Sequence, residues 1–205
     1  YLWQTFFFVF VQFYCSIYMG VFLSYLLAAA TLGVLFLRDG RLKVVRAIAS
    51  FQKEPLKNQG VFVLMTFFSA MAVIWLLNRY QATAHEYGFT KSIGEISNML
   101  PTLKSYLVSD LSRLSSWVGQ WSGDLPVRWE HQLFVGIGVA MIASYWAIVV
   151  LTAERNEIFG RVALASWCLL FVATLYLNGV SIYLWLIKTI PAISAIRVVS
   201  RIILI

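Results

Sequence analysis

Residues 61–77 read VFVLMTFFSAMAVIWLL, a run in which no side chain carries a charge. As a helix, a run of this length rises about 25 Å, which is close to the thickness of the hydrocarbon core of a bilayer. The stretch therefore predicts a membrane-spanning helix, and the sequence on either side of it is best understood from that starting point.

The composition of the whole chain agrees with this stretch. Of the 205 residues, 60% are hydrophobic, 16% are aromatic and only 12% are charged, and the mean hydropathy is +0.78. Average soluble proteins carry about 25% charged residues, so this chain has roughly half the charge that an aqueous surface needs. The composition excludes a water-soluble domain, a disordered tail and a disulfide scaffold, and it predicts an integral membrane protein.

Further apolar runs lie on both sides of the first. Residues 1–37 contain no charged residue, and as one helix they would measure about 55 Å, so we expect two helices that turn near 16–20. The predicted fold class is all-α, a polytopic bundle of transmembrane helices that forms a single domain over 1–205. Its expected spans lie at 1–17, 20–37, 61–77, 132–152 and 162–177, with the start of another at 202.

Basic residues set the expected orientation of these spans. Residues 38–60 hold six Lys and Arg against two acidic residues, which places this segment in the cytoplasm by the positive-inside trend. The loop 78–131 then lies outside, the turn 153–161 inside and residues 179–200 outside. Membrane topology explains most of the formal net charge of +7, because the basic residues cluster beside apolar runs. We therefore expect no nucleic-acid partner.

Other features limit the chemistry of the chain. It begins with Tyr1 and ends with Ile205, each inside an apolar run, so we expect a piece of a longer protein. Cys15 and Cys168 lie within apolar runs, as buried structural thiols do. The sequence contains no metal-ligand spacing and no phosphate-binding glycine loop, so we expect no metal and no cofactor.

The loop expected outside is longer than a connection between two spans requires. Ser92 and Glu95 form an S-x-x-E capping box, which predicts the start of a helix, and Pro101 interrupts or restarts it. Apolar residues then recur at steps of three and four, opposite a polar face that includes Ser105. This pattern predicts an amphipathic helix over 102–121 in the outer, extracytoplasmic interface, or a lid that packs on neighbouring spans.

Three polar clusters are candidate functional sites. Tyr87 follows the preceding span, where it could hold a sugar by stacking or serve only as an interfacial anchor. Glu130 and His131 precede the next span, and Glu130 could be a base, a hydroxyl-binding carboxylate or an ordinary partner of a helix start. Arg197 and Arg201 share one helix face, where paired guanidinium groups suit phosphate oxygens or lipid headgroups.

A family resemblance rests on the last two of these clusters. The run E-H-Q-L-F-V-G at 130–136 opens a span, and I-P-A-I-S-A-I-R-V-V-S-R at 190–201 leads into another. The pairing resembles the C-terminal half of bacterial polytopic proteins of the GT-C membrane glycosyltransferase superfamily, including its YfhO-like branch, which implies the bacterial inner membrane. The Y-G-F loop at 87–89 and the Y-M-G turn at 18–20 fit the same pattern.

The resemblance implies transfer of a sugar at the outer face from a polyprenyl-phosphate-linked donor to a lipid, glycan or protein. Arg197 and Arg201 would pair with the lipid phosphate, while Glu130, His131 and Tyr87 would line the sugar or acceptor cleft. The catalytic carboxylate of that superfamily lies near the N-terminus of the whole protein, so it is expected outside this chain.

Two other classes remain open. A transporter or flippase of lipid-linked sugars would also need outer arginines. It would in addition need charged residues in the middle of its spans, and the predicted spans after residue 60 contain none. A membrane subunit that only scaffolds a partner would use the same arginines for assembly.

Overall fold

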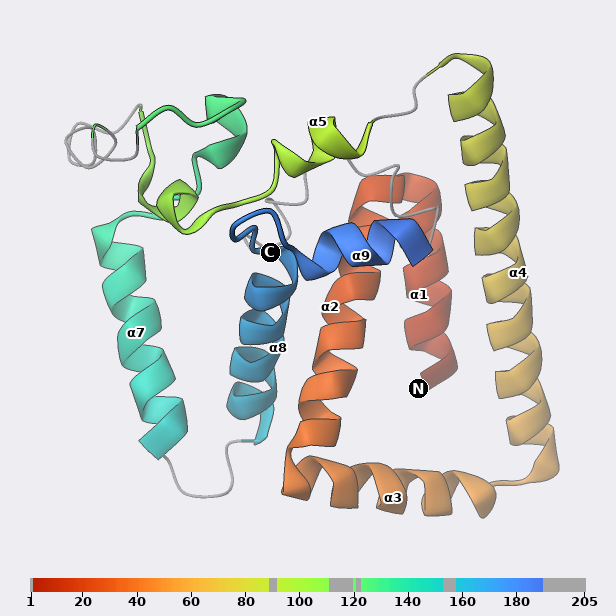
Figure 1. Ribbon diagram of the computed structural model, residues 1–205. Coiled ribbons are helices and arrows are strands. Elements are labelled where there is room, and N and C mark those ends of the chain that lie inside the picture. The colour runs from red at the N-terminus through yellow and green to blue at the C-terminus, as the bar shows by residue number, and fades with distance from the viewer. Residues whose placement is uncertain (1, 89–91, 111–119, 121–122, 153–157, 190–205) are drawn as a thin grey trace. The chain divides into compact units, whose positions relative to one another are not determined.

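The computed structural model shows a helical chain (Figure 1). Its described residues form eight α-helices, two 3₁₀ helices and one isolated bridge, so the predicted all-α class is confirmed for this part of the chain. The chain divides into two compact units, Tyr1–Phe89 and Thr90–Ile205. The residues that the structure describes are 2–88, 92–110, 120, 123–152 and 158–189.

The described residues of unit 1 form four α-helices, α1 to α4. Helices α1 and α2 run antiparallel and pack against each other, α4 packs against α1, and α3 lies across between the end of α2 and the start of α4 (Figure 1). The four helices are α1 Leu2–Cys15, α2 Ile17–Phe36, α3 Arg38–Gln52 and α4 Leu56–Glu86.

A tight turn joins α1 to α2 where the sequence predicts a hairpin. Ser16 is extended, and its hydroxyl accepts a hydrogen bond from the Met19 backbone N–H at 3.4 Å, so it caps α2. A Cβ on Gly20 would lie 2.6 Å from Cγ and 2.8 Å from Cα of Phe13. Only glycine therefore permits the close approach of the two helices at this point.

Two helices of unit 1 are long and apolar enough to cross a membrane: Ile17–Phe36 and Leu56–Ala84. In the most apolar 18 residues of each, 22% and 0% of the residues are buried. The core helix of a soluble protein would bury most of such a window, and these two helices bury little of theirs. The predicted span 61–77 lies within the second helix, which exceeds it at both ends.

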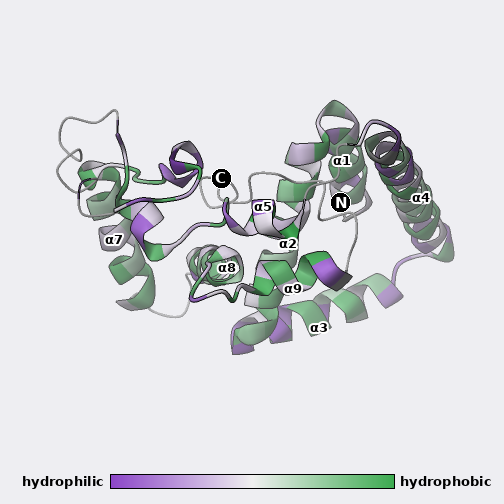
Figure 2. Cartoon of the chain, turned by 45° about the horizontal axis from the view of Figure 1, so that its top comes forward, coloured by the Kyte–Doolittle hydropathy of each residue, from purple (hydrophilic) through white to green (hydrophobic). Residues whose placement is uncertain are grey.

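The segment 38–60, expected as a cytoplasmic loop, is mostly helical. Helix α3 occupies Arg38–Gln52, and hydrophilic and hydrophobic residues are interspersed along it (Figure 2). At the corner with α2, a Cβ on Gly40 would overlap the carbonyl oxygen of Val34, so this corner requires glycine.

The corner between α3 and α4 is held by side chains. The amide nitrogen of Gln59 donates to the carbonyl oxygens of Phe51, Gln52 and Glu54 at 3.3, 3.3 and 2.9 Å. These bonds satisfy carbonyl groups that the end of a helix leaves without a helical partner. The rings of Phe51 and Phe62 also pack edge to face, with centroids 5.1 Å apart, so the angle between the helices is fixed on two sides.

Unit 2 contains the apolar helices α7 Ile137–Thr152 and α8 Ile158–Thr174. Helix α7 begins five residues later than the span predicted at 132–152, because the chain before it is extended and paired elsewhere. Past α8, Asn178 and Gly179 have positive φ angles of 48° and 88°, which form the turn into α9 Ile182–Thr189.

A compact region precedes α7, and we call residues 92–110 and 123–136 the cap. The predicted capping box is confirmed: the Ser92 hydroxyl accepts from the Glu95 N–H, and the Glu95 carboxylate accepts from the Ser92 N–H, both at 3.2 Å. The helix that it opens, α5 Ile93–Ser97, ends before Pro101. Two 3₁₀ helices complete the cap, η1 Leu103–Leu107 and η2 Arg128–His131.

The continuous amphipathic helix predicted over 102–121 is wrong. Among the described residues of this segment, Leu103–Leu107 forms a 3₁₀ turn, Gln120 is helical, and Val108 between them has an extended backbone with φ −93° and ψ 126°. The carbonyl oxygen of Ser105 accepts from the Leu133 N–H at 3.2 Å, which takes the place of a partner within a helix. Residues 111–119 and 121–122 of the predicted helix lie outside the described residues.

The fold divides the apolar stripe of that prediction, because Ile96 and Leu100 are buried in the cap while Ile93, Leu103 and Leu107 are exposed. Ile96, Leu100 and Val108 are at most 1% exposed, and each buried side chain of this size contributes about 2 kcal/mol. Tyr106 of η1 packs on Phe171 of α8 with ring centroids 4.9 Å apart, which attaches the cap to that helix. The two buried members of the stripe and Val108 therefore form a small core within the cap.

Candidate functional site

The five predicted site residues lie in three places. Tyr87 is 65% exposed in the turn that ends α4, in unit 1. Glu130 and His131 are neighbours in η2, in the cap of unit 2. Arg197 and Arg201 lie outside the described residues. The described structure thus brings together only Glu130 and His131, and the candidate site is the surface around η2.

His131 lies in the interior of the cap and is 1% exposed. Its Nε2 is 3.0 Å from the carbonyl oxygen of Asn98, and its Nδ1 is 2.7 Å from the hydroxyl of Ser105. A carbonyl group only accepts, so we assign the proton of a neutral imidazole to Nε2, and Nδ1 then accepts from the Ser105 hydroxyl. His131 therefore links the two halves of the cap, and this geometry favours a structural role.

Ser105 completes the same network. The sequence pattern places it on an exposed polar face, but in the structure it is fully buried. Its hydroxyl accepts from the Thr102 N–H at 2.9 Å and lies 3.1 Å from the Thr102 hydroxyl. With its own proton given to His131, every polar atom of the Ser105 side chain is satisfied, as a buried hydroxyl requires.

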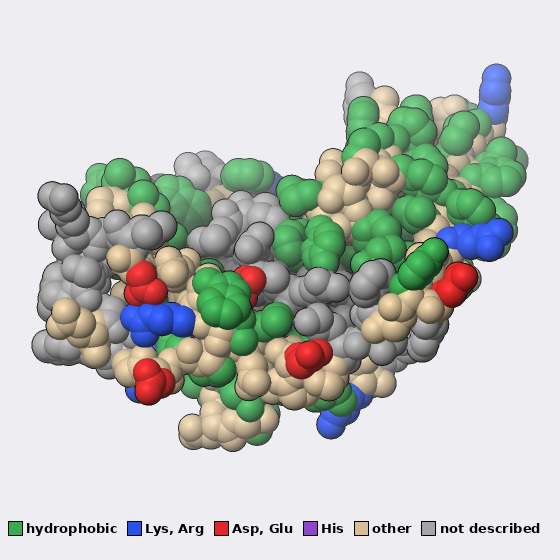
Figure 3. All heavy atoms as spheres, turned by 90° about the horizontal axis from the view of Figure 1, so that it is seen from above, with side chains coloured by type: hydrophobic (Ala, Val, Ile, Leu, Met, Phe, Trp, Pro, Cys, Tyr) green, Lys and Arg blue, Asp and Glu red, His purple; other side chains and the backbone are tan. Residues whose placement is uncertain are grey.

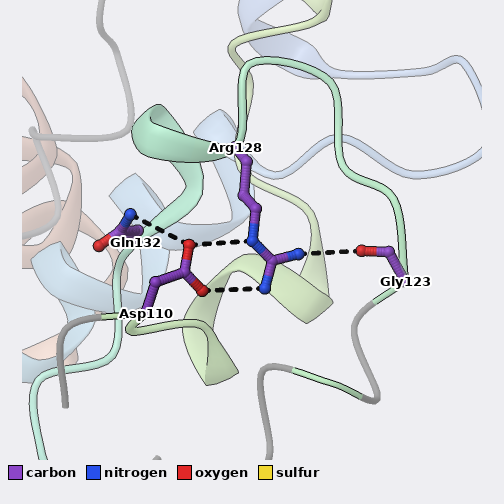
Figure 4. Close-up of polar contacts among 4 residues, drawn as sticks. All are labelled: Asp110, Gly123, Arg128 and Gln132. Atoms are coloured by element: carbon purple, nitrogen blue, oxygen red, sulfur yellow. Dashed lines mark hydrogen bonds and ion pairs between the residues drawn. The ribbon is translucent and has the colours of Figure 1, made fainter. Parts of the chain in front are cut away.

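An ion pair closes the second part of the cap (Figure 4). Nε and Nη2 of Arg128 donate to Oδ2 and Oδ1 of Asp110, both at 2.9 Å, and Nη1 donates to the Gly123 carbonyl oxygen at 3.0 Å. The Gln132 amide adds a hydrogen bond to Asp110 at 3.3 Å. This two-pronged geometry is the strongest arrangement of arginine and carboxylate, and it uses all three guanidinium nitrogens within the cap.

The ion pair shifts the pKa values of both Asp110 and Arg128. Hydrogen bonds from Arg128 lower the pKa of Asp110 below its ordinary value, and the same bonds raise the pKa of Arg128. The two side chains are 35% and 37% exposed, so water screens their attraction and the gain in stability is small. The pair instead fixes the geometry of the segment that leads into η2.

The residue between the ion pair and the buried histidine is displayed outward. Trp129 is 72% exposed, with Arg128 before it and the half-buried Glu130 after it. Figure 3 looks down on the side that carries the cap and shows acidic and basic side chains beside exposed hydrophobic groups. Trp129 therefore offers an exposed aromatic face, which suits a ligand with an apolar surface, and Glu130 follows it in the chain with its Oε2 buried.

The backbone that enters η2 is strained. Val127 has φ 50° and ψ 49°, a left-handed conformation that a β-branched residue rarely adopts. Such a conformation costs on the order of 1–3 kcal/mol and persists where surrounding contacts enforce it, often at binding sites. The ion pair after Val127 and the buried histidine beyond it supply those contacts.

Comparison of the chain with models of protein families, with curated proteins and with solved structures finds no match. The described residues contain no group of three or more His, Cys, Asp or Glu that could hold a metal ion. The interpretation of the cap therefore depends on its own geometry.

Reasoning from the sequence missed two residues that build the site, Asp110 and Ser105. Asp110 lies 18 residues from Arg128, and Ser105 lies 26 residues from His131. Both separations are much longer than the steps of two to four residues by which local patterns relate side chains, and only the folded loop brings the partners together. The helical spacing of the neighbouring apolar residues placed Ser105 on an exposed polar face, whereas in the structure it is buried.

Proposed function

We propose that this chain is the membrane-embedded part of a glycosyltransferase-like protein. In this proposal the protein transfers a sugar from a polyprenyl-phosphate donor at the extracytoplasmic face of a bacterial inner membrane. Helices α2 and α4 cross the bilayer, the cap lies on the outer side, and the catalytic carboxylate belongs to a part of the protein outside this chain.

Membrane placement is supported by exposure. The apolar windows of α2 and α4 bury 22% and 0% of their residues, so most of their apolar side chains keep some contact with the surroundings of the chain. Transfer of apolar side chains out of water is favourable by about 25 cal/mol per Å², and a bilayer provides that environment on all sides of a helix.

The observation that carries the sugar-binding part is the exposed Trp129 on a fixed segment. An aromatic ring can stack on the C–H face of a sugar, and a neighbouring carboxylate such as Glu130 can accept hydrogen bonds from its hydroxyl groups. His131 and Asp110 hold this segment from behind, as a preorganised binding site needs. In the proposal His131 is a positioning residue and touches no sugar.

The remaining predicted residues keep their proposed roles on the strength of the sequence resemblance. Arg197 and Arg201 would bind the lipid phosphate, on which negative charge grows as the sugar leaves. Tyr87 would contact the sugar or the acceptor.

The test measures transfer of a radiolabelled hexose from its polyprenyl-phosphate donor by the full-length protein in proteoliposomes. We expect Trp129→Ala and Glu130→Gln each to lower kcat/KM by about ten-fold, which corresponds to a loss of about 1.4 kcal/mol. Arg197→Gln and Arg201→Gln should raise the KM for the donor, because each removes a phosphate contact.

The matched control is Trp75→Ala, which removes another exposed tryptophan, 57% exposed on α4. It should leave transfer unchanged. Normal transfer in all four site variants contradicts the proposal. If the variants change assembly with a partner while transfer is retained, the scaffold function is correct. If the donor crosses the membrane without sugar transfer, the protein is a transporter.

A further inference from the structure

Exposed hydrophobic side chains follow the end of α8 within nine residues of the chain. The exposed fractions are 47% for Leu177, 73% for Val180, 49% for Ile182 and 64% for Trp185. Residues 175–187 contain no charged side chain. A cluster of exposed hydrophobic side chains on a folded protein marks a surface that contacts another molecule or a membrane.

The turn at 177–180 holds two of these side chains in a fixed direction. The Leu177 N–H donates to the Val180 carbonyl oxygen at 3.0 Å, and the Val180 N–H donates to the Leu177 carbonyl oxygen at 2.9 Å. Asn178 and Gly179 between them have positive φ angles, as a two-residue hairpin turn requires. Side chains of a directly paired antiparallel couple project to the same face, so Leu177 and Val180 point to one side of the turn.

Helix α9, which follows the turn, has a buried face and an exposed face. Tyr183 and Ile187, one helical turn apart, are 2% and 7% exposed. Since successive residues are about 100° apart, Trp185 lies opposite the middle of this buried face, with Ile182 and Lys188 as its exposed neighbours. Lys188 lies in the last turn of α9 and is its only charged residue, so the exposed face before it is apolar.

Hydrogen bonds to α8 and to the cap fix the position of α9. The Ser181 hydroxyl donates to the Ala173 carbonyl oxygen at 3.4 Å and accepts from the Tyr183 N–H at 3.3 Å. The Tyr176 N–H donates to the Pro101 carbonyl oxygen of the cap at 2.8 Å. Helix α9 then runs across the axis of α8 (Figure 1, Figure 2).

The length of α8 relates this arrangement to the bilayer. Its 17 residues give about 26 Å, which is close to the thickness of the hydrocarbon core. If α8 crosses the membrane with the cap on the outer side, α9 lies along the outer surface. Its exposed hydrophobic side chains then lie at the depth where headgroups meet acyl chains.

We propose that the turn 177–180 and the exposed face of α9 form an interfacial anchor, a surface that binds lipids of the outer leaflet. Val180, Ile182 and Trp185 enter the boundary between headgroups and acyl chains, and Lys188 binds a lipid phosphate group. The proposal extends the proposed membrane placement to α8 and is independent of sugar transfer. A protein partner could also cover hydrophobic side chains, but this surface begins at the end of an apolar helix, where the bilayer is the nearest apolar environment.

The experiment uses the full-length protein in vesicles of phosphatidylethanolamine and phosphatidylglycerol, with every native cysteine replaced by Ser. A nitrobenzoxadiazole label is attached to Val180→Cys or Ile182→Cys, and the control carries it on Asp124→Cys, an exposed acidic position of the cap. A lipid with a nitroxide near the headgroup end of an acyl chain should quench the labels at 180 and 182 at least about three-fold more than the label at 124. Iodide in the water should quench the label at 124 more than the other two.

The contribution of Trp185 is measured with the label on Ile182→Cys. Trp185→Ala should lower quenching by the nitroxide lipid about two-fold, because the aromatic side chain that holds α9 at the interface is lost. The matched control is Trp129→Ala, which removes a tryptophan of similar exposure, 72% against 64%, and should leave the quenching unchanged. Both side chains are more than half exposed, so the fold should be retained.

Equal quenching by the nitroxide lipid at 124, 180 and 182 would overturn the proposal. If neither the nitroxide lipid nor iodide reaches the labels at 180 and 182, a protein covers this surface, which also overturns it. Equal effects of Trp185→Ala and Trp129→Ala would overturn the role of Trp185. Sugar transfer enters none of these readouts, so failure of this proposal is distinguishable from failure of the proposed function.

Discussion

His131 connects parts of the cap that are distant in sequence, and the connection depends on both ring nitrogens. Its partners are the Ser105 hydroxyl and the Asn98 carbonyl oxygen, and His131 and Ser105 are both buried away from bulk solvent. A buried polar group without its partner costs about 1–3 kcal/mol.

We expect His131→Ala to lower the free energy of unfolding by about 3 kcal/mol, because it removes two hydrogen bonds and leaves a cavity. Ser105→Ala should cost about 1 kcal/mol. The double variant should cost less than the sum, since the two residues share a bond. Thermal unfolding in detergent measures all three, and strict additivity would contradict the network.

The ion pair of Asp110 and Arg128 predicts a dependence of stability on pH. The pKa of Asp110 is lowered below its ordinary value in the folded protein, mainly by hydrogen bonds from Arg128. The contribution of the pair is therefore complete at a pH above the unfolded pKa and is lost as the pH falls through the lower folded pKa.

Asp110→Asn should accordingly lower the melting temperature slightly near neutral pH, and the difference from the unchanged protein should shrink below about pH 4. The effect is small, because both side chains are partly exposed. Melting curves across this range provide the measurement. A difference in melting temperature that grows as the pH falls would contradict this prediction, because the ionised pair would then not be the stabilising form.

At the level of elements, the α1–α2 hairpin depends on one missing side chain. A Cβ at Gly20 would meet both the ring and the backbone of Phe13, and the backbone cannot move aside without displacing the helix. Repacking of a close contact of this kind costs about 1–3 kcal/mol.

Gly20→Ala should therefore lower the thermal stability of unit 1. Gly60→Ala is the control, because Gly60 lies in α4 and an added Cβ there meets nothing within 4 Å. By helix propensity the control should be neutral or should stabilise by up to about 1 kcal/mol. Equal effects of the two substitutions on unfolding in detergent would contradict the close packing of α1 on α2.

The cap shows why periodicity alone misled the assignment of an element. Apolar residues at steps of three and four fit a helix, but they also fit a short helix, a 3₁₀ turn and an extended segment folded on a shared core. Ile96 lies in α5, Leu100 in the bend that follows it and Val108 in an extended segment, and all three are buried in the cap. Backbone hydrogen bonds from Leu133 to Ser105 and from Phe134 to Val108 stabilise these separate pieces in place of one continuous helix. No local pattern in the sequence predicts these hydrogen bonds.

At the level of the whole molecule, the length of α4 predicts on which sides of a membrane its two ends lie. Its 31 residues give a length of about 46 Å, more than the hydrocarbon core of a bilayer, so its two ends should lie on opposite sides. In sealed vesicles, Lys57→Cys and Glu86→Cys should each react with an impermeant maleimide from one side only, and from opposite sides. Reaction of both from the same side would contradict a crossing.

The sequence by itself determined the all-α class and the long apolar helices of this chain, because hydrophobic content and the length of apolar runs depend on composition and are independent of packing. It also predicted the turn near Ser16 and the capping box of Ser92 and Glu95, since both are local in the chain.

Only the tertiary structure decided the roles of His131, Ser105 and the pair of Asp110 and Arg128. Their partners are 18 to 33 residues away, so burial and hydrogen bonding depend on how the loop folds back on itself. It likewise revealed that the basic segment after α2 is a helix held at both ends, because a corner glycine and a glutamine amide act through contacts that composition does not encode.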